Sequence, residues 1–353
     1  MKMNPENSAK KFLQEITEKD GIVIVFNNDA DGVCSCALVE KYLEKKGCGK
    51  PFIISQPMPP EDSLIRKIQT TVPTKIIFLD MAIDQEQGFM KKLGNLCDML
   101  IIDHHQITND MNSKHIVHLN PRLKNKDIYQ SATYLTYKLL SQAADMSDRM
   151  WVAAVGMIAD YNLDDSKDVV EEIRKKYEVK ESKLYDSHLG RLADMISAAK
   201  ASKQLSMEQL VTLFTEMKDP YDFEARNGNK LMSAYQEVEN ELVRIRQELD
   251  TKTEKIGDII FYKFSSKYNL RSPVSTMLSE KHRDKIVMVY EKVTSWIDVS
   301  ARNQSKRYNL GLLLKEAAEG LKASAGGHEA AAGAKIAEKD WEKFKEKLIE
   351  LTA

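Results

Sequence analysis

The sequence has few cysteines, and they do not form the patterns of a disulfide-rich protein or of a cysteine-bound metal site. Its 353 residues include four cysteines, and none forms a Cys-x-x-Cys pair. Such sparse thiols are typical of free cysteines in a reducing cytoplasm. No apolar run approaches the roughly 20 residues of a membrane span, and residues 1–11 lack the apolar segment of a signal peptide. We therefore expect a cytoplasmic protein that does not associate with membranes.

An excess of charge of one sign is also lacking. The chain has 52 Lys and Arg residues against 53 Asp and Glu residues, for a formal net charge of −1. There is thus no global basic field that would by itself indicate nucleic-acid binding, although a local basic groove is compatible with a neutral protein. The length exceeds that of one ordinary domain and predicts two or three domains.

Apolar runs of strand length alternate with helical patterns in the first part of the chain. The expected strands are Gly21–Phe26, Pro51–Ser55, Lys75–Leu79 and Met99–Ile102, with a further one at His115–Leu119. The expected helices include Lys10–Glu18, Val33–Lys46, Asp62–Thr70, Gln85–Leu93, Ala132–Gln142 and Asp148–Ala159. Strands that are apolar on both faces and alternate with helices predict a doubly wound, mainly parallel α/β domain.

The pattern changes twice further along the chain. From residue 166 to about 255, charges recur at helical spacing and strand runs are absent, which predicts a helical insert and linker. Strands then return at Ile259–Phe264, Lys285–Tyr290 and Ser295–Ser300, and helices are expected at Leu310–Leu321 and Ala337–Leu351. We therefore expect a first α/β domain at 1–165, the insert at 166–255 and a smaller α/β domain at 256–353.

Acidic residues and histidines follow three of the expected strands. The first strand runs into Asn27–Gly32, the third into Asp80, and the fourth into Asp103-His104-His105. Asp160 closes a further apolar run and is expected to point to the same place. Ligands of open parallel sheets bind at the carboxyl ends of the strands, so these side chains are predicted to converge.

Carboxylates and imidazoles in one pocket indicate divalent cations such as manganese, magnesium or zinc. A bridging carboxylate can hold two metals about 3.5–4 Å apart, which suits an in-line phosphoryl displacement. Gly32 would let the backbone approach a phosphate, and the helix after it offers N–H groups to an anion. As single residues, Asp29, Asp31 and Asp80 are equally compatible with turns and helix caps. The adjacent histidines are harder to explain in that way.

The sequence resembles the DHH phosphoesterase superfamily. Asn27–Gly32, Asp80, Asp103-His104-His105 and Gly156–Asp160 resemble its four N-terminal motifs, and Gly326–Gly333 resembles the glycine-rich signature of the DHH-associated C-terminal domain. The resemblance implies Mn²⁺ or Mg²⁺, two ions per active site. The implied metal ligands are Asp29, Asp31, Asp80, His104 and Asp160, with Asp80 bridging both ions.

The resemblance implies further roles around the metals. Asp103 would orient a histidine, and His105 would contact the scissile phosphate or its leaving oxygen. Arg302, His328, Gly326 and Gly327 would bind substrate, whereas Ala330, Ala331 and Ala332 are expected to serve helix packing. The sequence departs from the family at Asn27, where His or Asp is usual. Because an amide oxygen is a poorer ligand, the metal site nearest Asn27 is expected to be weak.

Within the superfamily, the chain most resembles RecJ-like single-strand nucleases of the archaeal type. The implied activity is an exonuclease on single-stranded DNA or RNA, with a strand bound in a cleft between domains. Candidate phosphate contacts are Lys267, Arg271, Arg302, Lys306 and Arg307. One alternative is a weakly active or inactive replisome scaffold that binds the GINS complex and a helicase. Another is a nanoRNase that acts on short oligonucleotides.

Overall fold

The computed structural model describes residues 4–94, 96–161, 163–222, 228–305 and 307–352. The chain divides into two compact units, one ending at Tyr235 and the other beginning at Gln236. These units differ from the three segments expected from the sequence, because the helices between residues 167 and 216 pack into the core of the first unit. The division at residues 165 and 255 remains a prediction about domain boundaries.

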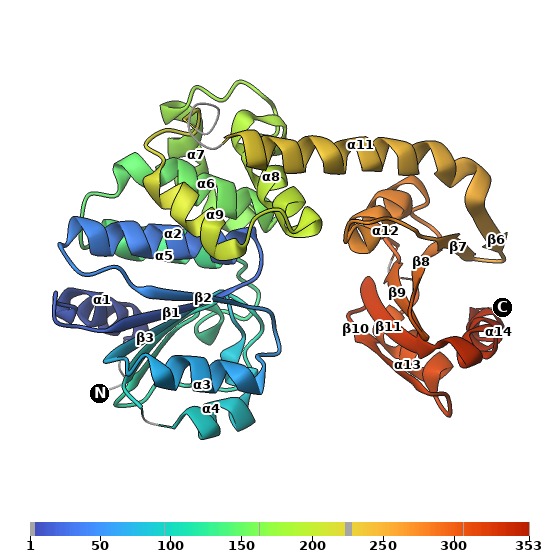
Figure 1. Cartoon of the computed structure of the whole chain (residues 1–353), viewed down its shortest axis with the longest axis horizontal. Helices are drawn as coiled ribbons and strands as arrows, with labels where there is room; N and C mark the ends of the chain where they lie inside the picture. Colours follow the sequence, from blue (N-terminus) through green and yellow to red (C-terminus); the bar gives the residue numbers. More distant parts are fainter. Residues whose placement is uncertain (1–3, 95, 162, 223–227, 306, 353) are drawn as a thin grey trace. The chain divides into compact units, whose positions relative to one another are not determined.

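A parallel sheet of five strands forms the centre of the first unit (Figure 1), in the order β2-β1-β3-β4-β5. The strands are β1 (Ile22–Asn27), β2 (Phe52–Gln56), β3 (Lys75–Leu79), β4 (Asp98–Ile102) and β5 (Ile116–Leu119). Ile24 and Phe26 of β1 belong to one hydrophobic core, whereas Val23 and Val25 belong to another. Both faces of the sheet are thus covered, which confirms the predicted doubly wound α/β fold.

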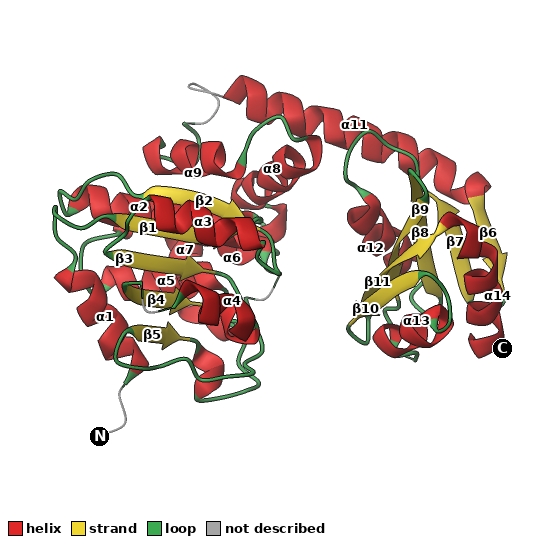
Figure 2. Cartoon of the chain, turned by 60° about the horizontal axis from the view of Figure 1, so that its bottom comes forward, coloured by secondary structure: helices red, strands yellow, loops and turns green. Residues whose placement is uncertain are grey.

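Helices form a layer on each side of this sheet (Figures 1 and 2). One core contains side chains of α1 (Pro5–Glu15), α2 (Ala30–Lys45), α5 (Ala132–Ser141), α6 (Met150–Ala159), α7 (Lys167–Lys176), α8 (His188–Ser202) and α9 (Met207–Glu216). The other core contains side chains of α3 (Asp62–Thr70) and α4 (Gln87–Leu93). Short 3-10 helices lie at Ile83–Gln85, Pro121–Leu123, Ser147–Arg149, Asp164–Ser166 and Leu184–Asp186.

The first helix lies earlier in the chain than expected. The Asn4 side chain accepts a hydrogen bond from the Glu6 amide, and Pro5 occupies the first turn, so that α1 begins there and ends at Glu15 rather than Glu18. Side-chain capping and an N-terminal proline are both strong start signals. The prediction was wrong here because it relied on apolar spacing alone.

The second unit contains a mixed sheet of six strands in the order β10-β11-β9-β8-β7-β6. These are β6 (Thr253–Ile256), β7 (Ile259–Lys263), β8 (Ile286–Val293), β9 (Trp296–Arg302), β10 (Ala323–Gly327) and β11 (Ala331–Ala337). The pair β7–β8 is parallel, and the other neighbouring pairs are antiparallel. The helices are α12 (Arg271–Lys281), α13 (Leu310–Ala318) and α14 (Trp341–Thr352), with a short 3-10 helix at Glu338–Asp340. A long helix, α11 (Gly228–Lys252), begins in the first unit and ends in the second.

Three features of the second unit were not predicted. Helix α12 was missed, and the small-residue segment forms strands β10 and β11. Strand β6 was also missed, because it begins within the segment expected to be helical. Ala331 and Ala332 begin β11, where Ala332 is buried in the same core as Leu314 of α13. Among the described residues, none of the helices has the length and apolar character needed to cross a membrane.

Candidate metal centre

The candidate residues lie where the order of the central sheet reverses. The chain passes from β1 to its neighbour β2 and then to β3 on the other side of β1. Asp29 and Asp31 follow β1, and Asp80 follows β3. In open α/β sheets, ligands bind at this reversal point, outside the carboxyl ends of the strands. The topology therefore places these three carboxylates where a ligand site is expected.

His104 lies at the centre of the cluster and is buried. Its Nε2 atom is 3.2 Å from Asp80 Oδ1 and 3.9 Å from Asp31 Oδ2, and its Nδ1 atom is 3.5 Å from Asp160 Oδ2. Asp160 is the residue after the last turn of α6. Residues that follow β1, β3 and α6 thus meet around the imidazole of His104, which itself follows β4.

The local structure explains why Asp29 and Asp31 follow β1. Asp29 is the N-cap of α2, and its side chain accepts a hydrogen bond from the Gly32 amide. Asp31 accepts hydrogen bonds of 2.8 Å from the amides of Ala132 and Thr133 at the start of α5. The helix-cap interpretation of these aspartates is therefore correct for both. It does not exclude metal binding, since each carboxylate oxygen has more than one lone pair.

Gly32 is required by a close approach within the protein itself. A Cβ atom at this position would lie 2.2 Å from the carbonyl oxygen of Asn27. Only glycine therefore lets the first turn of α2 pass the end of β1 at this distance.

Burial and mutual repulsion favour the protonated forms of these carboxyl groups when no cation is bound. Burial, together with the charge of a neighbouring aspartate, raises the pKa of Asp31 to about 6 and that of Asp160 to about 8. The pKa of Asp80 is also raised well above its ordinary value by burial, Asp29 and Asp31. A divalent cation would remove this repulsion and stabilise the ionised ligands.

His104 is in the form that a metal requires. Burial, together with the charge of His105, lowers the pKa of His104 to about 4, so that the ring is neutral at pH 7. A neutral imidazole nitrogen is a common ligand of transition metals.

Asp103 holds His105 in place. Its Oδ1 atom accepts a 2.7 Å hydrogen bond from Nδ1 of His105, and its Oδ2 atom accepts one from the His105 amide. Burial alone would lower the pKa of His105, yet this hydrogen bond and the charge of Asp103 raise it above the usual value. Asp103 therefore orients the second histidine of the motif and favours its protonated form.

The donor set fits divalent metal ions. Asp80, His104 and His105 form one group whose ligand atoms lie within 4.8 Å of one another, and Asp31, His104 and Asp160 form a second. Asp80 Oδ1, His104 Nδ1 and Asp160 Oδ2 are buried and have no hydrogen-bond partner in the part of the chain that the structure describes. Buried polar atoms without partners are rare and indicate a ligand such as a cation.

Asn27 presents its amide nitrogen to the cluster. Its Nδ2 atom donates hydrogen bonds to Asp29 Oδ2 and, at 3.1 Å, to Asp80 Oδ2, while its Oδ1 atom accepts one from the Asn28 amide. In this orientation Asn27 links two carboxylates as a donor, and it would have to turn its oxygen inward to bind a metal. Asp29 belongs to neither three-residue group found among the described residues.

Three residues beside the cluster were missed by the sequence analysis. Asn120 donates hydrogen bonds to Asp103 Oδ2 and to the carbonyl oxygen of His105, and Arg122 Nε donates to the carbonyl oxygen of His104. The Tyr129 ring meets His104 edge-on, with centroids 5.1 Å apart. Asn120 follows β5, so the strand-end rule could have identified it. No sequence signal identifies Arg122 or Tyr129.

The predicted substrate residues lie in the second unit. Arg302 ends β9, and its guanidinium donates to the hydroxyls of Ser272 and Thr276 on α12 and to the Ala301 carbonyl oxygen. Burial lowers its pKa. Gly326 and Gly327 end β10, and His328 is exposed in the turn to β11.

The other predicted phosphate contacts are paired within the protein. Lys267 lies 3.9 Å from Glu237, Arg271 lies 3.2 Å from Glu291, and Arg307 lies 2.8 Å from Asp258. Lys306 lies outside the described residues. No ion pair joins Arg302 to a carboxylate within the described ranges, so this guanidinium is the best placed of the set to bind an anion.

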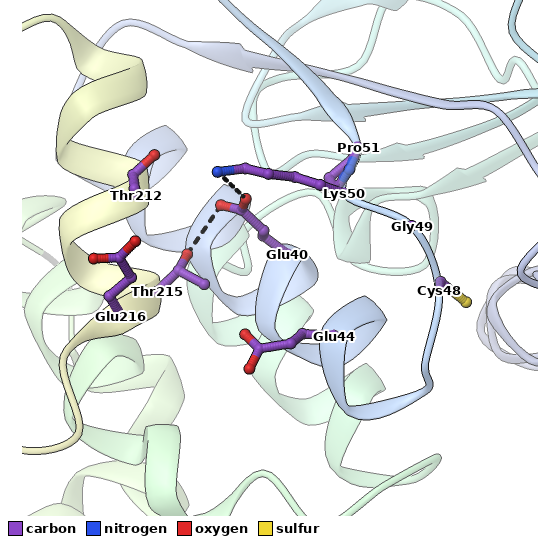
Figure 3. Close-up of a pocket in the computed structure, with 9 residues that line it drawn as sticks. All are labelled: Glu40, Glu44, Cys48, Gly49, Lys50, Pro51, Thr212, Thr215 and Glu216. Atoms are coloured by element: carbon purple, nitrogen blue, oxygen red, sulfur yellow. Dashed lines mark hydrogen bonds and ion pairs between the residues drawn. The ribbon is translucent and has the colours of Figure 1, made fainter.

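A separate cavity of about 280 Å³ is lined by α2, α9 and the segment before β2 (Figure 3). It contains the carboxylates of Glu40, Glu44 and Glu216. The buried Glu40 accepts a 3.1 Å hydrogen bond from Thr215 and lies 3.4 Å from Lys50. The groups of potential metal ligands found among the described residues do not include Glu40, Glu44 or Glu216. The Glu40–Thr215 contact joins α2 to α9.

Comparisons with known proteins agree with this geometry. Residues 21–160 match the family model described as the DHH family, N-terminal domain, and residues 261–353 match the DHHA1 domain. The search of curated proteins gave no match.

Among solved structures, exonuclease RecJ bound to manganese is 18% identical with a TM-score of 0.75, covering 100% of this chain and 95% of that one. RecJ from Thermus thermophilus in complex with Mn²⁺ is 20% identical with a TM-score of 0.75, covering 100% and 55%. CDC45 from Entamoeba histolytica is 12% identical with a TM-score of 0.55, covering 98% and 97%. At these identities the likeness shows a shared fold. With the two domain matches and the Asp103-His104-His105 motif, the chain belongs to the DHH family and carries an N-terminal DHH domain and a DHHA1 domain.

Proposed function

We propose that this protein is a metal-dependent exonuclease that hydrolyses single-stranded DNA or RNA to mononucleotides. The observation that carries the proposal is the cluster of Asp31, Asp80 and Asp160 around the neutral ring of His104, with buried ligand atoms that have no other partner among the described residues. The fold shared with RecJ supports a nuclease in particular.

In this proposal, Asp31, Asp80, His104 and Asp160 would hold one Mn²⁺ or Mg²⁺ ion, and Asp29 and Asp80 would hold a second ion more weakly. Bound divalent metals of this kind activate water and stabilise the charge that develops on the phosphate oxygens. Asp80 would contact both ions, because its Oδ1 atom lies 3.2 Å from His104 Nε2 and its Oδ2 atom lies 3.1 Å from Asn27 Nδ2, which also contacts Asp29.

The remaining roles belong to residues that contact the substrate. Asp103 fixes Nδ1 of His105, so that Nε2–H of the protonated ring is left to donate to a phosphate oxygen or the leaving oxygen. Arg302 binds a phosphate of the strand, because a guanidinium matches two phosphate oxygens at once. The Gly326-Gly327-His328 turn binds the nucleotide end.

A degradation assay tests this function. DNA and RNA strands labelled at either the 5′ or the 3′ end are incubated with the protein over a broad manganese titration. We expect the protein to release labelled mononucleotides from one end of a single strand. We expect it to leave duplexes intact. No release from any strand at any manganese concentration would refute the exonuclease. Cleavage confined to oligonucleotides of a few residues would favour a nanoRNase instead.

Asn27 favours a second candidate function, a weakly active or inactive replisome scaffold that binds GINS and a helicase. Its amide occupies the position between Asp29 and Asp80, where a metal would otherwise bind. The fold shared with CDC45 is consistent with such a role. The scaffold predicts binding to purified GINS in size-exclusion chromatography and no release of nucleotides. The exonuclease predicts release of nucleotides whether or not GINS is present.

A further inference from the structure

An exposed tyrosine directly follows a residue of the metal cluster. Tyr161 is 78% exposed, and it is bonded to Asp160, whose carboxylate lies 3.5 Å from His104. Phe52 and Tyr221 are also large exposed aromatics, at 52% and 57%, but neither is adjacent in sequence to a cluster residue. Tyr161 is thus a large exposed aromatic residue that adjoins the cluster in sequence.

The backbone of Tyr161 is held in an unfavourable conformation. Its φ of 60° lies in the left-handed region, which costs energy for a bulky residue. Tyr185 supports it, since the Tyr185 hydroxyl donates a 2.8 Å hydrogen bond to the Tyr161 carbonyl oxygen. The two rings stack with centroids 5.9 Å apart and planes 17° apart. The chain thus uses a second tyrosine to fix an exposed ring next to the metal cluster.

A third tyrosine contacts the cluster itself, because Tyr129 packs edge-on against His104. The Tyr185 hydroxyl contacts the carbonyl oxygen of Tyr161, the residue that directly follows Asp160. The chain therefore joins the aromatic pair to the cluster at Asp160.

We propose that the Tyr161 ring, supported by Tyr185, is a stacking platform for the base of a nucleotide next to the scissile phosphate. This inference rests on the proposed function, because it assumes a single-stranded nucleic-acid substrate. Every base has a π-face, so such a platform accepts any sequence and selects bases over an abasic site. Tyr161 is then a positioning residue that acts through binding of the strand.

The test compares Tyr161→Ala, Tyr161→Phe and Tyr161→Trp with the unaltered protein in the presence of Mn²⁺. One single strand carries the fluorescent base 2-aminopurine near its reactive end, and a matched strand carries an abasic site there. KM and kcat are measured with ordinary phosphodiester linkages. Fluorescence quenching and Kd are measured with phosphorothioate linkages, which resist hydrolysis. Tyr221→Ala, which removes another exposed tyrosine that stacks on His188, is the matched control.

We expect Tyr161→Ala to raise KM and Kd on the base-bearing strand by on the order of tenfold and to lose the quenching. We expect kcat, the Mn²⁺ affinity and the melting temperature to change little. Tyr161→Phe and Tyr161→Trp should restore KM, because they keep an aromatic ring. On the abasic strand, Tyr161→Ala and the unaltered protein should be equal.

Two results would overturn the inference. One is an unchanged KM and quenching in Tyr161→Ala on the base-bearing strand. The other is an equal rise of KM and Kd in Tyr161→Ala on the base-bearing and the abasic strand, which would assign the ring a structural role. If the unaltered protein hydrolyses nothing but quenches 2-aminopurine through Tyr161, the exonuclease fails and the platform stands. If Tyr161→Ala hydrolyses the base-bearing strand with the same KM as the unaltered protein, the stacking platform is rejected and the exonuclease stands.

Discussion

The amide of Asn27 makes the two sides of the metal cluster unequal. On one side, Asp31, Asp80 and Asp160 surround a neutral imidazole. On the other side, the Asn27 amide donates hydrogen bonds to Asp29 and Asp80 and competes with a cation for the same oxygens. For the proposed metal centre we therefore expect a strong site and a weak site, because affinity for a divalent cation depends on the number of charged ligands.

Asn27→Asp should strengthen the weak site. The substitution replaces an amide donor with a carboxylate ligand, and we expect the weaker Mn²⁺ dissociation constant to fall by at least about tenfold in isothermal titration calorimetry. Asn125→Asp, an exposed position outside the cluster, controls for the added negative charge. Unchanged binding in Asn27→Asp would show that the amide does not weaken this site.

The stability of the metal-free protein should fall as the pH rises. Asp31 and Asp160 have folded pKa values of about 6 and 8, above the ordinary value of 3.8, so the folded state holds more protons than the unfolded state between these limits. Stability from these groups is complete below pH 4 and is lost as the pH passes their folded pKa values. Melting temperatures in EDTA from pH 5 to pH 9 should show this loss. At pH 8, added Mn²⁺ should raise the melting temperature again. A melting temperature at pH 8 that is the same with and without Mn²⁺ would contradict a metal site.

At the scale of elements, strands that are buried on both faces were predictable, and elements built from small or hydroxyl residues were not. β3 was predicted at its observed bounds, and the residues after β1, β3 and β4 identified most of the cluster. α12 was missed because its buried face includes Ser275 and Ser279 as well as Val274 and Leu278. β10 and β11 are rich in Ala and Gly, which have low strand propensity. Their register is set by pairing of β11 with β9 and of β10 with β11. Tyr129 was missed because packing alone brings it to His104.

The position of α6 depends on a glycine. A Cβ atom at Gly156 would lie 2.3 Å from Thr133 Oγ1 on α5 and 2.8 Å from Cys34 Cβ on α2. Gly156→Ala should therefore separate these helices, lower the stability by about 1–3 kcal/mol and displace Asp160. Urea unfolding and Mn²⁺ affinity measure the two effects. In Gly88→Ala on α4, where a Cβ atom meets nothing within 4 Å, stability should instead stay the same or rise. A fully stable Gly156→Ala would show that the helices adjust.

At the scale of the whole molecule, the proposed metal ligands and the proposed phosphate-binding arginine lie in different compact units. The proposed ligands belong to the DHH domain at 21–160, and Arg302 belongs to the DHHA1 domain at 261–353. Because the two roles belong to different units, we expect that a substitution in one unit can weaken metal binding or substrate binding without affecting the other.

Arg302→Lys should impair substrate binding alone. A lysine keeps the charge but loses the planar group that binds two phosphate oxygens, so we expect KM for a single strand to rise about tenfold. The Mn²⁺ affinity should not change, because no metal ligand is altered. Arg307→Lys, at a guanidinium already paired with Asp258, is the matched control. A weaker Mn²⁺ affinity in Arg302→Lys would contradict this division of roles.

The most direct test of the account is the effect of Asp80→Asn on Mn²⁺ binding and on hydrolysis of a labelled single strand. Asp80 lies 3.2 Å from His104 Nε2 and is the carboxylate proposed to bridge both metals, so its loss removes a ligand from each. We predict that the unaltered protein releases mononucleotides only when Mn²⁺ is present. We also predict that Asp80→Asn folds, binds Mn²⁺ much more weakly and releases none. Turnover and Mn²⁺ affinity that survive in Asp80→Asn would contradict a metal centre at these strand ends.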